Sequence, residues 1–88
     1  MQQPKEPDIK PLIYIIDHDE HALASLASLL APLNASIKSF TSAESFLKEF
    51  INNNKACLLL EAHLPGLGGI ELMEYLMSQG HNIPTIVM

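Results

Sequence analysis

The chain has 88 residues, of which 48% are hydrophobic and 17% are charged, so it can build one small core and is not a disordered or low-complexity segment. Its net charge of −5 argues against direct binding of DNA or RNA, because a module that grips phosphates is expected to be basic. The single cysteine, Cys57, excludes an intrachain disulfide.

Residues 1–11 are predicted to form an N-terminal tail, and residues 12–88 to form the domain. The tail contains three prolines and four charged residues, and the apolar run that follows it ends at Asp17, which is too short for a signal peptide. The longest uncharged stretch, residues 22–37, includes serine, proline and asparagine and falls short of the ~20 apolar residues that span a bilayer. We therefore expect a cytoplasmic protein without a membrane segment.

Four short segments are typical of β-strands. Residues 12–16 (LIYII) and 57–60 (CLLL) are continuous apolar runs, as expected for strands buried on both faces of a sheet. Residues 35–40 alternate weakly and include Lys38, which suits an edge strand. Residues 83–88 (IPTIVM) begin a fourth strand.

The first of three predicted helices starts at Glu20. Its apolar positions recur at i, i+3, i+4 and i+7, the spacing of an amphipathic helix, and Pro32 and Asn34 are expected to end it. The predicted stripe consists of Leu26, Leu29, Leu30 and Leu33.

Two further helices follow. Residues Thr41 to Glu44 match a capping box, in which the threonine hydroxyl and the glutamate each satisfy a free backbone N–H group, and residues 52–54 (NNN) should end this helix. A loop over residues 64–69 precedes the third helix, and Gly80 is its expected C′ residue. The predicted stripes are Ala43, Phe46, Leu47 and Phe50 in the second helix, and Ile70, Leu72, Met73, Leu76 and Met77 in the third.

The order of these elements, βαβαβαβ, predicts an α/β fold with a parallel sheet and right-handed crossovers. In such a sheet, functional polar groups collect at the carboxyl ends of the strands. The first strand is followed by residues 17–21 (DHDEH) and the third by residues 61–63 (EAH). If these two strands are neighbours, the two polar clusters meet.

From Leu12 onward the sequence resembles the receiver domain of two-component response regulators, in particular receivers that precede LuxR-type DNA-binding domains. The matching stretches are IYIIDHDE, SFTSAESFL, CLLLEAHLPGLGGIELMEYL and IPTIVM, within a region that covers about seven-eighths of the chain. The resemblance implies a flavodoxin-like (CheY-like) doubly wound parallel sheet. The last strand and helices of that fold are missing from the 88 residues, so we expect a partial receiver domain whose fourth strand is an open edge.

The resemblance also implies where the phosphorylation site lies. Receivers hold Mg²⁺ with two adjacent carboxylates after the first strand, a phosphorylatable aspartate after the third, and a backbone carbonyl two residues later. Asp17 matches the first carboxylate, and His18 occupies the second position, with Asp19 one residue further on. Glu61 stands at the phosphoacceptor position, and His63 at the position of the carbonyl.

These departures predict an atypical receiver. The extra methylene of Glu61 moves its carboxylate by about 1.5 Å, which disturbs an attack geometry of roughly 3–3.5 Å. His18 supplies a nitrogen where Mg²⁺ prefers oxygen, so magnesium binding is weakened and no cofactor is assigned with certainty. We therefore expect a non-enzymatic phosphorelay module that is not phosphorylated and acts through protein contacts with a histidine kinase or a transcription-regulating output domain. Glu61 as a mimic of the phosphorylated state stays an open alternative.

Two alternatives and one further prediction accompany this interpretation. The first is a transition-metal site for Zn²⁺, Mn²⁺ or Ni²⁺, since histidine and carboxylate ligands follow both strands. The second, a flavodoxin-like cofactor site, has little support because no phosphate-binding loop follows the first strand. The third is self-association through the exposed edge of the fourth strand. The metal ligands in the first alternative would be Asp17, His18, Glu61 and His63, with Asp19 and His21 nearby.

Overall fold

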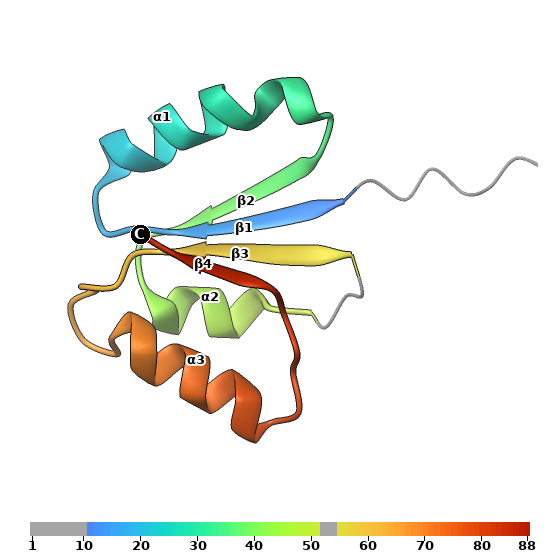
Figure 1. Cartoon of the computed structure of the whole chain (residues 1–88). Coiled ribbons are helices and arrows are strands. Elements are labelled where there is room, and N and C mark those ends of the chain that lie inside the picture. The colour runs from blue at the N-terminus through green and yellow to red at the C-terminus, as the bar shows by residue number, and fades with distance from the viewer. Residues whose placement is uncertain (1–10, 52–54) are drawn as a thin grey trace, which may run out of the picture.

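The computed structural model describes residues 11–51 and 55–88, and it shows a four-stranded parallel sheet with helices on both faces (Figure 1). The strands are β1 (Leu12–Ile16), β2 (Ser36–Phe40), β3 (Ala56–Leu60) and β4 (Thr85–Val87). The helices are α1 (Glu20–Leu30), continued by the 3₁₀ turn η1 (Ala31–Leu33), α2 (Ala43–Glu49) and α3 (Gly69–Ser78). The predicted order βαβαβαβ is confirmed. The predicted tail, except Pro11, and the predicted helix end at residues 52–54 lie outside the described residues.

The strand order is β2-β1-β3-β4, and every neighbouring pair is parallel. The chain winds from β1 to β2 in one direction and to β3 and β4 in the other, so the sheet is doubly wound, as expected. The predicted edge position of β2 is confirmed. Ile16 pairs with Leu60 at the ends of the two central strands, so the polar residues that follow them, Asp17 and Glu61, emerge side by side.

The larger part of the core lies between the sheet and helices α2 and α3 (Figure 1). At its centre the fully buried Tyr14 ring meets the Phe46 ring edge-on, with centroids 5.1 Å apart and planes at 84°. Phe40 packs against the same phenylalanine at 5.7 Å and 79°. Such edge-to-face contacts favour one arrangement of the rings and so fix how α2 sits on the sheet. The predicted apolar stripe of α2 faces this core.

The opposite face of the sheet is covered by α1, and here the predicted stripe is partly wrong. Leu23 is buried against Ile13 and Ile15, with Leu26 and Leu30 packed beside it. Leu29 is 74% exposed, and so it is not part of the core. The physical reason is rotation: a helix seated by positions 23, 26 and 30 turns position 29 away from the sheet. A second exposed leucine, Leu33, lies beyond the α-helix in η1.

The start of α2 differs from the predicted capping box by one residue. Ser42, rather than Thr41, is the N-cap, and its hydroxyl accepts a hydrogen bond from the backbone N–H of Ser45 at 3.1 Å. The Ser45 hydroxyl donates back to the Ser42 carbonyl at 2.9 Å. Glu44 therefore takes no part in the cap, and its carboxylate reaches a different segment of the chain, described below.

Helix α3 spans Gly69–Ser78, and the prediction of Gly80 as its C′ residue is confirmed. The φ of Gly80, +79°, is the left-handed conformation typical of that position. Its backbone N–H donates to Met77 O at 3.0 Å and that of His81 donates to Leu76 O at 2.9 Å, the pattern of a Schellman motif. The prediction that Met77 belongs to the core is wrong, since this side chain is 69% exposed. Among the described residues, no helix is long and apolar enough to cross a membrane.

Candidate functional site

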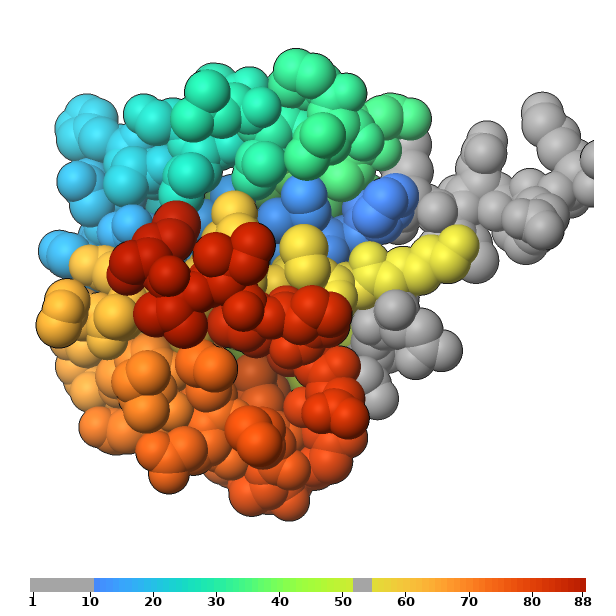
Figure 2. Space-filling model, viewed as in Figure 1, coloured from blue at the N-terminus to red at the C-terminus, as the bar shows by residue number. Residues whose placement is uncertain are grey.

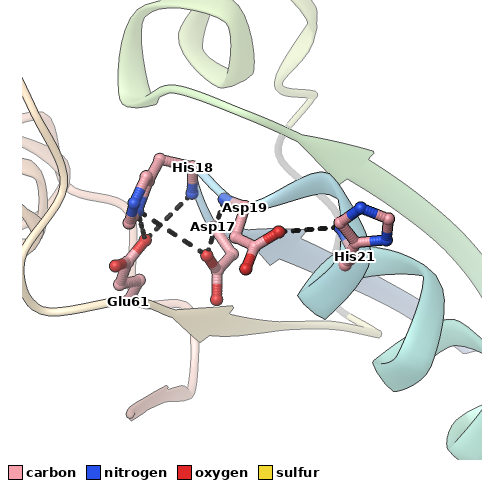
Figure 3. Close-up of polar contacts among 5 residues, drawn as sticks. All are labelled: Asp17, His18, Asp19, His21 and Glu61. Carbon is pink, nitrogen blue, oxygen red and sulfur yellow. Dashed lines mark hydrogen bonds and ion pairs between the residues drawn. The ribbon is translucent and has the colours of Figure 1, made fainter.

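Three polar side chains meet where β1 and β3 end (Figure 3). His18 Nδ1 lies 2.7 Å from Glu61 Oε2 and 3.8 Å from Asp17 Oδ1. The backbone N–H of His18 also donates to Glu61 Oε2 at 2.9 Å, so one carboxylate oxygen receives two contacts from the same residue. We call Asp17, His18 and Glu61 the carboxylate–histidine cluster. It brings together three of the four residues that the sequence proposed as metal ligands.

The backbone of the sheet holds this cluster in place. Glu61 N–H donates to Ile16 O at 2.9 Å, and Asp17 N–H donates to Phe40 O at 3.1 Å, so the ladder extends one residue past each strand. The two carboxyl groups are mostly buried, with side-chain exposures of 17% for Glu61 and 15% for Asp17, whereas His18 is 53% exposed. The two carboxylates are thus the more buried part of the cluster, and the imidazole is its solvent-exposed part.

Asp19, assigned to the acidic pocket from the sequence, has a different role. Its side chain caps α1 by accepting a hydrogen bond from the backbone N–H of His21 at 2.9 Å (Figure 3). Its own N–H donates to Asp17 Oδ1, also at 2.9 Å, and so orients that carboxylate. The step of one residue at the strand end turns this side chain from the carboxylate–histidine cluster toward the helix.

His63 does not join the cluster through its side chain. The residue is exposed, and the imidazole is absent from the group of potential metal ligands found among the described residues. A metal site built from Asp17, His18, Glu61 and the His63 imidazole is therefore not assembled in this structure. The assignment of the His63 backbone carbonyl stays a prediction.

The electrostatics of the cluster favour an ion pair between His18 and Glu61. The hydrogen bond to Glu61 and its negative charge raise the pKa of His18 above its ordinary value of 6.5. Partial burial acts to raise the pKa of Glu61, but hydrogen bonds from the backbone and side chain of His18 outweigh it and hold that pKa below 4.5. Burial and the neighbouring Glu61 carboxyl raise the pKa of Asp17, despite the opposing hydrogen bond from Asp19.

One residue that the sequence reading did not single out is Gly69. A Cβ atom at this position would lie 2.6 Å from the Glu61 carbonyl oxygen and 3.1 Å from Ala62 Cα. Helix α3 therefore approaches the backbone of the cluster closely because this residue has no side chain. The available signal was the Gly68-Gly69 pair, since glycine is the residue that permits a close approach of the backbone.

Glu44 is a second residue near the site that could not be identified from the sequence. Its Oε2 atom accepts a hydrogen bond from the backbone N–H of Leu67 at 3.3 Å, so α2 holds the loop that leads from β3 into α3. The same carboxylate lies against Gly66, whose φ of +75° allows the loop to turn there. This contact crosses 23 positions of the sequence, and local spacing gives no sign of it.

The comparisons with known proteins all indicate the same protein family. The family model of the response regulator receiver domain matches residues 13–88. The chain is 33% identical over 79 residues to the response regulator protein TodT of Pseudomonas putida, a match that covers 90% of this chain and 35% of TodT. It is 32% identical over 76 residues to the transcriptional regulatory protein FixJ of Azorhizobium caulinodans, with 86% of this chain and 36% of FixJ covered.

The solved structures agree with this match. A response regulator receiver protein from Pseudoalteromonas atlantica superposes with a TM-score of 0.80 at 46% identity, over 89% of this chain and 66% of that one. The chain thus spans about a third of the length of the curated relatives it matches and about two-thirds of this receiver structure. The parallel four-stranded sheet with helices on both faces fits the match. The chain belongs to the response regulator receiver family, whose members are signal-transduction modules of two-component systems.

Proposed function

We propose that this chain is an atypical receiver module, which does not accept a phosphoryl group at Glu61 and works through protein contacts. The observation that carries the proposal is the 2.7 Å contact between His18 Nδ1 and Glu61 Oε2. A nucleophilic carboxylate needs a free oxygen aligned with the incoming phosphorus. Here one oxygen of Glu61 is engaged by both the backbone and the imidazole of His18, and its longer side chain shifts the carboxylate from the position of an aspartate.

Receiver domains typically bind Mg²⁺ at this position, but the donor set of this chain does not fit that ion. Magnesium requires close to octahedral oxygen coordination at about 2.0–2.1 Å. His18 places a nitrogen beside both carboxylates, and its protonated form is itself a cation that neutralises Glu61. We propose that His18 fills the electrostatic role of the metal and that no step of the module's action requires Mg²⁺.

The same contact weakens the alternative in which Glu61 mimics a phosphorylated aspartate. A mimic must present negative charge to the groups that respond to phosphorylation. The charge of Glu61 is already paired with His18 at 2.7 Å, and the carboxyl group is only 17% exposed. The transition-metal alternative is likewise not favoured, because the His63 imidazole does not join the cluster and the chain is a receiver.

For partners, we propose a histidine kinase or an output domain, by analogy with the family, together with a second copy of this chain. Two relatives carry names that describe response and transcriptional regulation, which supports a role in transcription regulation. The net charge of −5 supports the absence of direct nucleic-acid contacts by this chain, and we propose a cytoplasmic location and no enzymatic activity.

The proposal is tested by incubating the protein with acetyl phosphate and Mg²⁺ and measuring its intact mass. We expect no added phosphoryl group on the wild type, while an authentic aspartate-bearing receiver, treated in parallel, shows that the reagent is active. A stable adduct that maps to Glu61 would overturn the proposal. The double variant His18→Asp, Glu61→Asp restores both oxygen ligands, and we expect Mg²⁺ to raise its melting temperature but not that of the wild type.

A further inference from the structure

The two ring nitrogens of His18 differ in their surroundings. Nδ1 lies 2.7 Å from Glu61 Oε2 and 3.8 Å from Asp17 Oδ1, so both carboxyl groups contact the ring through the same nitrogen. Within residues 11–51 and 55–88, Nε2 makes no such contact. The side chain is 53% exposed, and in Figure 2 the blue segment after β1 and the yellow-orange segment after β3 both reach the surface at the left. The ring is therefore accessible from solvent.

The contact with Glu61 decides which ring nitrogen carries the proton. An ionised carboxyl group can only accept hydrogen bonds, and the pKa of Glu61 is held below 4.5, so Nδ1 is the donor. In the neutral ring the free lone pair then lies on Nε2. A carboxylate that receives the Nδ1 proton also fixes the orientation of the ring and raises its basicity. Neutral His18 thus has the arrangement of an oriented nucleophile, with Nε2 as the attacking atom.

His18 also borders an open hollow at the start of α1. The Asp19 carboxylate is already engaged there, because it accepts the backbone N–H of His21 at 2.9 Å, and so it does not compete for the ring of His18. The imidazole of His21 and the hydroxyl of Thr41 are groups of the hollow that can donate hydrogen bonds to an anion. Besides His18, the hollow is lined by Asp19, Glu20, His21 and Thr41.

We propose that His18 is a phosphoryl-accepting histidine, whose Nε2 atom takes a phosphoryl group from donors in which phosphorus is bonded to nitrogen. The inference goes beyond the proposed function and rests on it in one respect: Glu61 orients the acceptor and is not itself the acceptor. Phosphorus is bonded to nitrogen in a phosphorylated histidine, so a histidine kinase, the partner proposed above, presents a donor of this class.

The transfer balances without a metal ion or a further reactant. The Nε2 lone pair of His18 attacks phosphorus, the N–P bond of the donor breaks, and its electron pair leaves with the donor nitrogen. In inorganic phosphoramidate that nitrogen is already protonated, so it departs as ammonia. The product ring carries the phosphoryl group on Nε2 and keeps its proton on Nδ1. It is therefore a cation, which Glu61 stabilises at the 2.7 Å contact.

The charge of the donor determines which reagent suits the site. Phosphoramidate with a protonated amine carries one negative charge fewer than acetyl phosphate. The carboxylates of Asp17 and Glu61 next to the ring repel the more highly charged donor more strongly. We therefore still expect no adduct from acetyl phosphate.

The first experiment incubates the wild-type chain with potassium phosphoramidate, without Mg²⁺, at about pH 8. This pH is chosen because the nucleophile is the neutral ring and the pKa of His18 is raised above 6.5. Modified peptides are mapped by mass spectrometry in alkaline solution, where the N–P bond survives. We expect His18 to be modified at least about tenfold faster than His21 and His63, exposed histidines whose rings contact no carboxyl group in the described part of the chain.

A second arm replaces phosphoramidate with phosphorylated imidazole, which has the linkage of a protein phosphohistidine. Modification of His18 by both reagents supports a protein donor, whereas modification by inorganic phosphoramidate alone assigns the site to small donors.

Variants separate the chemistry from the fold. Glu61→Gln keeps a hydrogen-bond acceptor for Nδ1 but removes its charge, and we expect it to slow the modification of His18 at least about tenfold. NMR of the modified ring should show phosphorus on Nε2 in the wild type and on both nitrogens in Glu61→Gln, a change that a merely structural role of Glu61 would not cause. His18→Gln should remove the fast site, and His21→Gln, the matched control, should retain it. Circular dichroism checks that each variant is folded.

Modification of His18 no faster than that of His21 and His63 in the wild type would overturn the proposal. So would a phosphoryl group on Nδ1 of the wild type, or an unchanged rate in Glu61→Gln. An adduct on Glu61 would be an acyl phosphate, which hydroxylamine cleaves, and it would refute the proposed function instead. The two failures are therefore distinguishable.

Discussion

Replacing Gly69 with alanine tests whether close backbone contact positions the carboxylate–histidine cluster. The new Cβ would lie 2.6 Å from the Glu61 carbonyl oxygen and 3.1 Å from Ala62 Cα. Both are backbone atoms, so no side-chain rotation can relieve the contact, and helix α3 or the end of β3 must shift. Gly68→Ala is the matched control, since its Cβ would meet only the Glu71 side chain at 3.6 Å, an ordinary van der Waals distance.

The expected change in the free energy of unfolding of Gly69→Ala follows from two opposing effects. Forcing an extra methyl into a packed site costs about 1–3 kcal/mol, and the shortest contact here favours the upper part of that range. Alanine in place of glycine also stabilises by up to about 1 kcal/mol, because it restricts the unfolded chain. We therefore expect Gly69→Ala to lower the free energy of unfolding by about 2 kcal/mol, which corresponds to a melting temperature lower by roughly 8–16 °C for a domain of this size.

The control substitution should be nearly neutral. The φ of Gly68, −72°, suits alanine, and alanine there stabilises the protein by about 0.4–1 kcal/mol because it restricts the unfolded chain. Gly68 is also the N-cap of α3, and alanine is a poorer N-cap than glycine by a similar amount, so the two effects offset each other. Both variants are compared with the wild type by urea and thermal denaturation, followed by circular dichroism at equal protein concentration. If Gly69→Ala proves as stable as Gly68→Ala, the close approach of α3 to Glu61 does not constrain the fold, and the reasoning is refuted.

Two further predictions concern the cluster and the start of α2. Because the pKa of His18 is raised in the folded protein, its contact with Glu61 stabilises fully below about pH 6.5 and is lost as the pH rises through the higher folded value. The lowered pKa of Glu61 sets the acid limit, so the stabilisation that this carboxylate contributes is lost as the pH falls below about 4.5. The melting temperature of His18→Gln should therefore fall furthest below that of the wild type at about pH 5–6, and the difference should shrink as the pH rises through the raised pKa of His18. A difference independent of pH would exclude the ion pair. Ser42→Ala should destabilise by about 1 kcal/mol in urea titrations, and Thr41→Ala by less than about 0.5 kcal/mol; the reverse order would show that Thr41 is the cap.

Much of the site could be anticipated because its residues directly follow buried strands. Asp17 and Glu61 come immediately after the apolar runs of β1 and β3, and parallel neighbours bring their carboxyl ends together. The different roles of the residues that follow β1 were harder to predict from the sequence. His18 turns back over Glu61, whereas Asp19 caps α1, and this difference depends on the path of the backbone as it leaves the sheet.

The wrongly predicted core positions in α1 and α3 share a physical cause. The leucine spacing in α1 is compatible with more than one buried stripe, and the seating of the helix on Ile13 and Ile15 selects Leu23 over Leu29. In the same way, Met77 has helical spacing suited to a core position but lies on the side of α3 that the sheet does not cover.

The sequence by itself determined the order of the elements, since strand and helix periodicity, turn residues and the glycine at position 80 act over a few neighbouring residues. It also determined which polar residues stand at the ends of the central strands. Only the tertiary structure decided that His18 engages Glu61 across 43 positions, that Glu44 holds the loop at Leu67, and that α3 needs Gly69 to approach β3. Those contacts depend on how distant segments dock and rotate against the sheet, which local spacing does not specify.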